Sequence, residues 1–253
     1  MSKDDIEERI RQEFRKEFSA YERLLTICEE VWNKSEGKRV VDGKFPLTFL
    51  VPILWAKAWK TAKAIRVVAS QGFGQDAFVL ARSLTNLTID LVYICAEDPD
   101  ERARSWMANG KIAYHRFNKQ TAEATSSNRG DADGQKTEEL ASKWRNKTIR
   151  DRAVAIGMQR TYDIAYRFAS SFEHSDSLSA LAFIDIDEEQ VGVDIGPNSG
   201  VVGPALVLGA LTLGDIVMAA ARYYSIDVDQ TAREIFTALQ PLFGILRKLG
   251  ETS

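Results

Sequence analysis

Histidine and cysteine, the side chains most used for metal binding and for imidazole or thiol chemistry, are scarce in this sequence. Two cysteines and two histidines occur among 253 residues. Cys28 and Cys95 lie far apart and belong to no CxxC pair or Cys/His cluster, which excludes zinc-finger and dithiol redox motifs. No secretory pattern precedes them, so we expect both thiols to be reduced and buried in a cytoplasmic protein.

The sequence also lacks convincing export and membrane-spanning segments. The N-terminal stretch MSKDDIEERIRQEF is charged and has no apolar centre of the kind found in signal peptides. The most apolar run, residues 201–221, approaches membrane-spanning length but contains Pro204, three glycines and Asp215. We therefore interpret this run as a buried core helix and expect no membrane association.

An excess of positive charge is absent as well. The formal net charge is -3, which excludes a globally basic polyanion binder and leaves room only for a local nucleic-acid surface. Hydrophobic residues make up 45% and charged residues 27% of the chain, as in ordinary globular proteins. The length is sufficient for one large core, so we expect residues 1–253 to form a single helical domain.

Apolar residues recur every three or four positions through most of the chain, which is typical of amphipathic helices. The stretch LAFIDIDEEQVGVDIG instead alternates apolar and polar residues around an acidic turn, which predicts a β-hairpin at 181–196. The predicted fold is an all-α bundle of seven or eight helices with one small β-hairpin. The predicted helices are a long N-terminal helix within 1–34, helices near 47–70, within 76–100 and from Pro99 to about 124, then 137–156, 159–174, 201–225 and a C-terminal helix at 228–249.

The apolar helix within 76–100 carries one polar stripe. Arg82, Asn86 and Asp90 follow one another at intervals of four residues, so their side chains share one helix face. Buried polar groups need partners. The stripe therefore predicts either a structural network that sets the register between helices or one wall of a functional site.

Several common catalytic and binding motifs are missing. The sequence contains no P-loop, no G-x-S-x-G and no H-E-x-x-H. GFGQDA (72–77) matches the glycine spacing of a dinucleotide fingerprint, but helical residues precede it, which favours a turn between two helices. Glu173, His174 and Asp176 have no specific metal-ligand spacing, and a helix end commonly collects such residues. We expect no metal and no cofactor.

The most informative stretch is YRFASSFEHSD (166–176). Arg167 and His174 are seven residues apart, nearly two helical turns, so both project from one face. An imidazole that moves protons and a guanidinium that stabilises phosphoryl charge are sufficient for metal-independent transphosphorylation of RNA. A structural interpretation is also open, because Asp163 can pair with Arg167 and a histidine near a helix C-terminus is favoured by the helix dipole. Asp163, Ser170 and Ser171 share this face.

A local basic segment precedes this helix. KWRNKTIRDR (143–152) groups five cations around a tryptophan, a pattern that suits phosphate contacts and base stacking. A solvated basic helix face is the alternative interpretation. The predicted RNA-binding residues are Lys143, Trp144, Arg145, Lys147, Arg150 and Arg152.

Two resemblances bear on function. The spacing of Arg167 and His174 resembles the R-x(4-6)-H motif of the HEPN ribonucleases, all-helical toxins and defence nucleases that cleave RNA without metal, usually as dimers. More broadly, residues 45–225 resemble an uncharacterised bacterial family, domain of unknown function 5677. Arg82 and Leu84 match its R-x-L-x-E pattern, with Asn86 in place of glutamate, and Tyr166, Ser170 and His174 match its Y-x-x-x-S-x-x-x-H pattern.

The HEPN resemblance implies a metal-independent ribonuclease of toxin or phage-defence type, acting as a homodimer on RNA, whereas the broader resemblance implies the helical architecture and the convergence of Arg82, Tyr166, Ser170 and His174. His174 would be the general acid/base and Arg167 the phosphate stabiliser. The alternative is a non-enzymatic helical interaction or scaffold module in a bacterial defence or regulatory system, with a partner protein as its target. The expected supporting residues are Arg82, Asn86, Tyr166, Ser170, Ser171 and Asp163.

Overall fold

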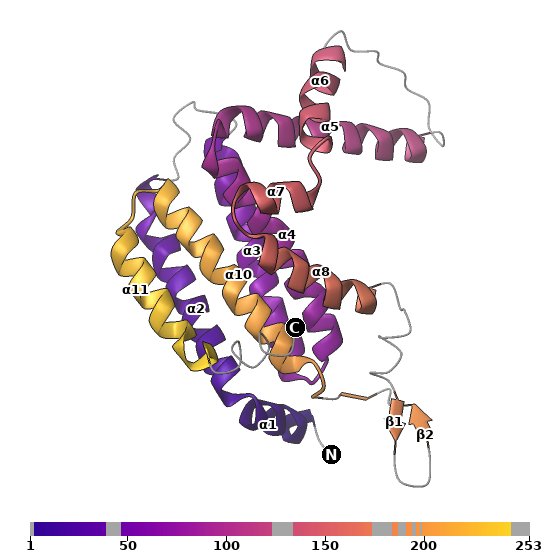
Figure 1. Ribbon diagram of the computed structural model, residues 1–253, viewed down its shortest axis with the longest axis vertical. Helices are drawn as coiled ribbons and strands as arrows, with labels where there is room; N and C mark the ends of the chain where they lie inside the picture. The colour runs from indigo at the N-terminus through magenta and orange to yellow at the C-terminus, as the bar shows by residue number, and fades with distance from the viewer. Residues whose placement is uncertain are drawn as a thin grey trace.

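An apolar helix at the centre of the bundle organises the fold. The computed structural model describes residues 3–38, 47–122, 134–173, 184–186, 191–193, 196–197 and 199–243. In it, α10 (Val202–Tyr223) packs against α2 (Arg15–Lys34), α3 (Leu47–Ser70), α4 (Gly74–Ala96) and α11 (Val228–Leu239). Figure 1 shows these five helices side by side. The all-α architecture is confirmed.

The remaining helices lie at the ends and on one side of this bundle. α1 (Lys3–Glu13) precedes α2, and the short 3₁₀ helix η1 (Glu36–Lys38) follows it. α5 (Pro99–Ala122) crosses one end of the bundle and packs against α6 (Gly134–Arg145), as Figure 1 shows. α7 (Ile149–Ala155) and α8 (Gln159–Glu173) both pack against α4. The α4 helix therefore contacts both the central core and the lateral helices.

Two short strands form an antiparallel ladder within the range 181–196. β1 (Ile184–Ile186) pairs with β2 (Val191–Val193), with Ile184 opposite Val193 and Ile186 opposite Val191. Alternation around the acidic turn accounts for this pairing.

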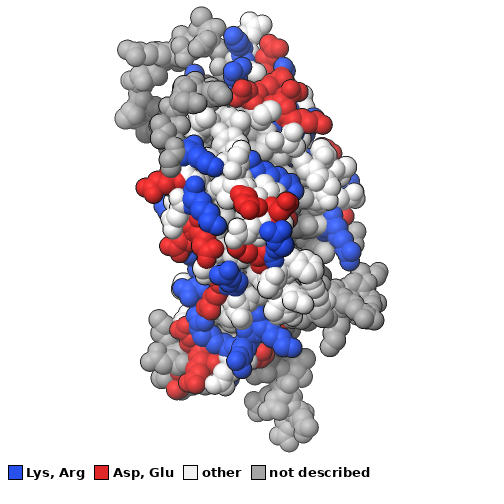
Figure 2. All heavy atoms as spheres, turned by 90° about the vertical axis from the view of Figure 1, so that its left-hand side faces the viewer, with Lys and Arg blue, Asp and Glu red and all other residues white. Residues whose placement is uncertain are grey.

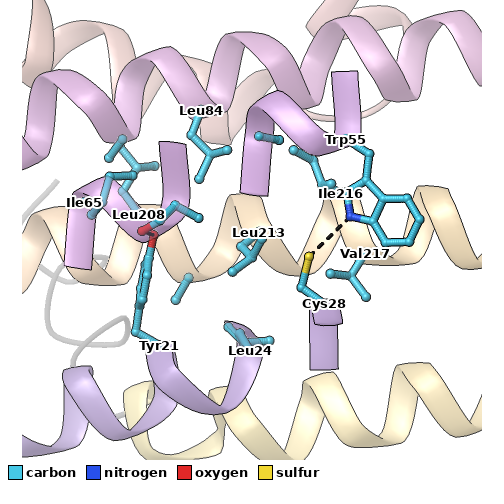
Figure 3. Packing of buried hydrophobic residues seen from close by; sticks show 14 of the residues in the cluster. Tyr21, Leu24, Cys28, Trp55, Ile65, Leu84, Leu208, Leu213, Ile216 and Val217 are labelled. Atoms are coloured by element: carbon cyan, nitrogen blue, oxygen red, sulfur yellow. Dashed lines mark hydrogen bonds between the residues drawn. The ribbon is translucent and has the colours of Figure 1, made fainter. Parts of the chain in front are cut away.

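Buried side chains from α2, α3, α4 and α10 pack together in the core (Figure 3). The Tyr21 hydroxyl donates to the Ala62 carbonyl at 3.1 Å, and the Trp55 indole donates to the Cys28 sulfur at 3.2 Å. Gly209 of α10 permits this packing, because a Cβ there would lie 2.8 Å from Cε2 of Tyr21. Tyr21 therefore lies directly over the α10 backbone.

The predicted count of seven or eight helices is too low, since ten α-helices occur in the described ranges. The predicted N-terminal helix within 1–34 divides at Phe14, whose ring packs against Gly203 while the backbone bonds from Phe14 to Ile10 and from Phe18 to Phe14 persist. The predicted helix at 137–156 divides at Thr148, which caps α7.

The predicted C-terminal helix at 228–249 is also wrong in its extent. α11 ends at Leu239 and continues as the 3₁₀ helix η3 (Gln240–Leu242). Pro241 accounts for the end of α11, because proline has no backbone N–H to donate to the preceding turn. Residues 244–249 lie outside the described ranges.

Two of the described helices, α4 and α10, are long and apolar enough to cross a membrane by length and composition. In α10, 78% of the most apolar window is buried inside the protein. Burial of this extent is typical of a core helix, which passes the same length and composition test.

Candidate functional site

One end of the polar stripe on α4 forms an aromatic stack with α8. The guanidinium carbon of Arg82 lies 4.3 Å from the ring centroid of Tyr166. The Tyr166 ring lies in turn 4.4 Å from the ring of Tyr162, with 30° between the planes. We call these three residues the Arg82 stack. It joins α4 to α8 one residue before Arg167.

The side chains of the Arg82 stack are only partly enclosed between α4 and α8. All three side chains are half-buried. Burial raises the pKa of Tyr162 above its usual value, so its hydroxyl stays protonated and can donate at neutral pH. A guanidinium stacked on a ring still directs its N–H groups outward in its own plane. The stack therefore joins one guanidinium group and two aromatic rings at the contact between α4 and α8.

Asn86 lies one turn from Arg82 on the same face. Its side chain is half-buried, and its Oδ1 atom is enclosed without a hydrogen-bond donor among the described residues. An enclosed acceptor without a partner costs free energy, so Asn86 does not stabilise this contact through its Oδ1 atom.

The other end of the stripe is structural. Asp90 Oδ1 accepts a hydrogen bond from Nε of Arg152 at 3.0 Å, and these two side chains are only 19% and 10% exposed. The Arg152 guanidinium also lies 4.3 Å from the Trp144 ring and donates to the Lys147 carbonyl. Burial raises the pKa of Asp90 although Arg152 acts in the opposite direction. This pair fixes α7 against α4.

A helix cap positions Arg152 for that pair. The Thr148 hydroxyl accepts from the Asp151 backbone N–H at 3.1 Å, and the Asp151 carboxylate accepts from the Thr148 N–H at 2.8 Å. The Thr148 hydrogen bonds hold the pKa of Asp151 below its usual value. The T-x-x-D spacing resembles the capping-box pattern and was visible in the sequence.

The structure does not bring the six predicted RNA-binding residues onto one exposed surface. Trp144 and Arg152 are buried, at 7% and 8% exposure. Lys143 pairs with Glu101 at 2.8 Å, and Arg145 pairs with Glu138. Lys147 and Arg150 are exposed. The tryptophan therefore serves helix packing, because a base cannot stack on a ring that solvent does not reach.

Sequence reasoning missed Tyr93, the residue around which α4, α5 and α6 meet. Its ring lies 3.9 Å from the Arg102 guanidinium carbon and 5.9 Å from the Trp144 ring. Lys147 Nζ lies 5.5 Å from the same ring. No local spacing pattern links Tyr93 to Trp144, because the two are distant in the chain.

The predicted catalytic pair falls largely beyond what the structure describes. His174 lies outside the described residues, immediately after the end of α8 at Glu173. Arg167, Ser170 and Ser171 are within α8 and are described by their backbone alone. Asp163 is half-buried in α8. The part of the predicted site that the structure brings together is thus Arg82 with Tyr166.

The cysteines carry no reactive character. The Cys28 side chain is fully buried and Cys95 is half-buried, and burial raises the pKa of each thiol to about 12. Thiolate is the reactive form, so neither residue is a nucleophile at neutral pH. Among the described residues, no group of three His, Cys, Asp or Glu side chains is arranged to hold a metal ion.

Comparison with known proteins gives one match. A family model, described as a family of unknown function (DUF5677), matches residues 49–191. The matched segment is shorter than the expected range of 45–225, but it includes all of α3 except its first two residues, α4 to α8 and the Arg82 stack. No curated protein and no solved structure matches the chain.

Proposed function

Because this chain belongs to the family of unknown function DUF5677, its activity must be inferred from its own residues, and we propose that it is a metal-independent endoribonuclease. His174 is the proposed general acid/base and Arg167 the proposed phosphate stabiliser. The proposed acting form is a cytoplasmic homodimer in a toxin or phage-defence setting.

The observation that carries this proposal is the Arg82 stack. Tyr166 holds the Arg82 guanidinium against α8, and Tyr166 is the direct neighbour of Arg167 in the chain. Successive residues of an α-helix diverge by about 100°, so the Cα–Cβ direction at Arg167 lies about 100° around α8 from that at Tyr166. In this proposal the guanidinium groups of Arg82 and Arg167, which come from two different helices, act together on a phosphate with developing negative charge.

The proposed reaction is transphosphorylation. The His174 imidazole removes the proton from a ribose 2′-OH, and O2′ forms a bond to phosphorus. The bond from phosphorus to O5′ then breaks, and O5′ takes up a proton. The products are a 2′,3′-cyclic phosphate and a 5′-hydroxyl end. Arg167 stabilises the charge on the phosphoryl oxygens in the transition state.

The direct test is cleavage of a mixed tRNA and mRNA pool in EDTA by wild type, His174→Ala and Arg167→Ala. Loss of a general acid/base typically costs about 10²- to 10⁴-fold in rate, so both variants should lose cleavage while their melting temperatures stay unchanged. Arg233→Ala is the matched control, because Arg233 is exposed on α11, away from α4 and α8. Wild type without cleavage products, or His174→Ala with full activity, contradicts the proposal.

Arg82 and Tyr166 are positioning residues in this scheme, and conservative variants test that role. Tyr166→Phe keeps the ring that supports Arg82, so it should retain cleavage, whereas Tyr166→Leu should lose it. Arg82→Lys keeps the charge but loses the planar stacking group, so it should also reduce cleavage. Equal loss in Tyr166→Phe and Tyr166→Leu would show that the stack itself does not matter.

A second candidate function is a non-enzymatic helical interaction module. The buried pair of Asp90 and Arg152 favours it, because one member of the α4 stripe stabilises the contact between helices. In a module of this kind, Arg82 and His174 variants lower the melting temperature and no RNA is cleaved. Measuring melting and cleavage on the same protein samples therefore separates the two candidates.

A further inference from the structure

The α5 helix concentrates positive charge after its first turn. From Arg102 to Ala122 the sequence contains five Lys or Arg residues and no Asp or Glu, although the whole chain has a net charge of -3. Lys111, His115 and Arg116 are all exposed. Two acidic side chains of the neighbouring region are paired, Glu101 with Lys143 and Glu138 with Arg145. Lys111 and Arg116 therefore carry exposed positive charge on a stretch of helix that has no carboxylates.

Two exposed aromatic rings lie on the same segment. Tyr114 is 64% exposed and Phe117 is 62% exposed, more than any other large hydrophobic side chain in the described part of the chain. They are three positions apart in the sequence, so on a helix they lie on the same side with a rise of about 4.5 Å between them. Exposing two large rings costs hydrophobic free energy unless another molecule covers them.

The packing of α5 explains why this segment is exposed. Ala103, Ser105 and Ala108 are buried, so the first half of α5 is the half that packs. From Gly110 to Phe117 no residue is buried. Figure 1 shows α5 extending across the end of the bundle and beyond its crossing with α6.

Positive and negative side chains are mixed on the face formed by α2 and α11, unlike on α5. There Lys and Arg side chains are interspersed with Asp and Glu, as Figure 2 shows. Arg23 lies 3.6 Å from Glu30, and Arg66 lies 3.6 Å from Glu22. Mixed charge of this kind offers no continuous attraction for a polyanion.

We propose that the segment from Lys111 to Phe117, which we call the α5 platform, binds single-stranded RNA. Bases stack on Tyr114 and Phe117, and phosphates contact Lys111 and Arg116. Charge complementarity identifies this occupant, because a single strand supplies flat apolar bases and regularly spaced negative charge together. This proposal adds an RNA-binding surface to the proposed nuclease and rests on that proposed function, because it takes RNA as the substrate.

The platform replaces the basic segment at 143–152 as the nucleic-acid surface. That segment has more cations than the platform, but its aromatic ring, Trp144, is buried. Base stacking needs an accessible ring face. Of these two segments of the described chain, only the platform combines exposed rings with exposed cations.

Binding is measured separately from cleavage. Fluorescence anisotropy follows a labelled single-stranded RNA in which every ribose carries a 2′-O-methyl group, which blocks the proposed nucleophile. Alanine substitution of a stacking residue typically weakens binding by about 5- to 150-fold per base. Tyr114→Ala with Phe117→Ala should therefore weaken binding at least about 10-fold, while the exposed positions allow an unchanged melting temperature.

Matched variants control for ring and charge. Phe236→Ala removes another highly exposed ring, at 59% exposure on α11, and should leave the RNA Kd unchanged. Lys111→Glu with Arg116→Glu should flatten the dependence of log Kd on log salt by about 1.4, because each phosphate that the protein neutralises contributes about 0.7 to that slope. Lys57→Glu with Lys60→Glu makes the same charge change on exposed α3 positions and should leave the slope nearly unaltered.

The outcomes are distinct. An unchanged Kd for the double alanine variant overturns the platform, and so does equal weakening by Phe236→Ala. If light scattering shows that the double alanine variant loses a dimer while keeping its RNA affinity, the platform is instead an interface between copies. Wild type that binds the methylated RNA through the platform but cleaves no natural RNA supports the platform and overturns the nuclease. If the double alanine variant cleaves RNA as fast as wild type, the platform is overturned and the nuclease proposal stands.

Discussion

Replacing Arg152 by alanine is expected to lower the free energy of unfolding by about 3–5 kcal/mol, the usual cost of leaving one member of a buried ion pair without its partner. The structure supports a value of this size. Arg152 is 8% exposed, and its replacement removes the 3.0 Å hydrogen bond to Asp90, the stack on Trp144 and the bond to the Lys147 carbonyl. Of these, the uncompensated charge of Asp90 contributes most.

The pKa of Asp90 predicts how this loss depends on pH. Burial raises that pKa even with Arg152 present, so removing the guanidinium raises it further. A raised folded-state pKa means that stability is lost as pH rises through it, and the deficit of Arg152→Ala should be larger at about pH 7 than at about pH 4.5. Replacing the pair by Asp90→Leu with Arg152→Met should bring the free energy to within about 1 kcal/mol of wild type or above it.

Equilibrium urea unfolding, followed by circular dichroism, measures these differences. Arg150→Ala is the control on the same helix, since Arg150 is exposed and should change the free energy of unfolding by no more than about 0.5 kcal/mol. A loss below about 1 kcal/mol for Arg152→Ala, or an equal loss for Arg150→Ala, would refute the reasoning that the pair is buried and structural.

Three other perturbations test the packing directly. Gly209→Ala should cost about 1–3 kcal/mol of stability, because the added Cβ would lie 2.8 Å from the buried Tyr21 ring. Gly110→Ala meets open space and should instead gain about 0.5–1 kcal/mol of helix stability. Thermal melting of both variants measures the difference. Thr148→Ala should lose about 1 kcal/mol with the cap of α7, and an unchanged melting temperature would contradict it. Burial raises the Cys28 pKa to about 12, so a thiol reagent at about pH 8 should react with Cys28 only after unfolding, and rapid native-state labelling would show that the sulfur is accessible.

Most helices were predictable because their signals are local. The range 47–70 matches α3, and 159–174 differs from α8 by one residue at its end. The errors occur where helices are interrupted without a glycine. The break at Phe14 depends on a contact with Gly203 on a distant helix, which no local window contains. The break at Thr148 did have a local signal, the T-x-x-D cap, and could have been predicted.

The candidate site was predictable only in part. The four-residue spacing correctly assigned Arg82, Asn86 and Asp90 to one face of one helix. It could not distinguish their roles, because those depend on α7 and α8. Arg152, which is 62 positions further along the chain, pairs with Asp90 and makes that end of the stripe structural. Trp144, expected to stack on bases, is instead enclosed by Tyr93 and Arg152.

The sequence by itself determined that the chain is helical, where most helices begin and end, and which face of each is apolar, since backbone periodicity and capping act over a few residues. Tertiary structure alone decided which apolar faces meet, and with them which polar side chains are buried as partners and which reach solvent. The physical reason is that an amphipathic face specifies burial but not a neighbour. The identity of the neighbour turned Arg152 into a structural residue and left Tyr114 and Phe117 exposed.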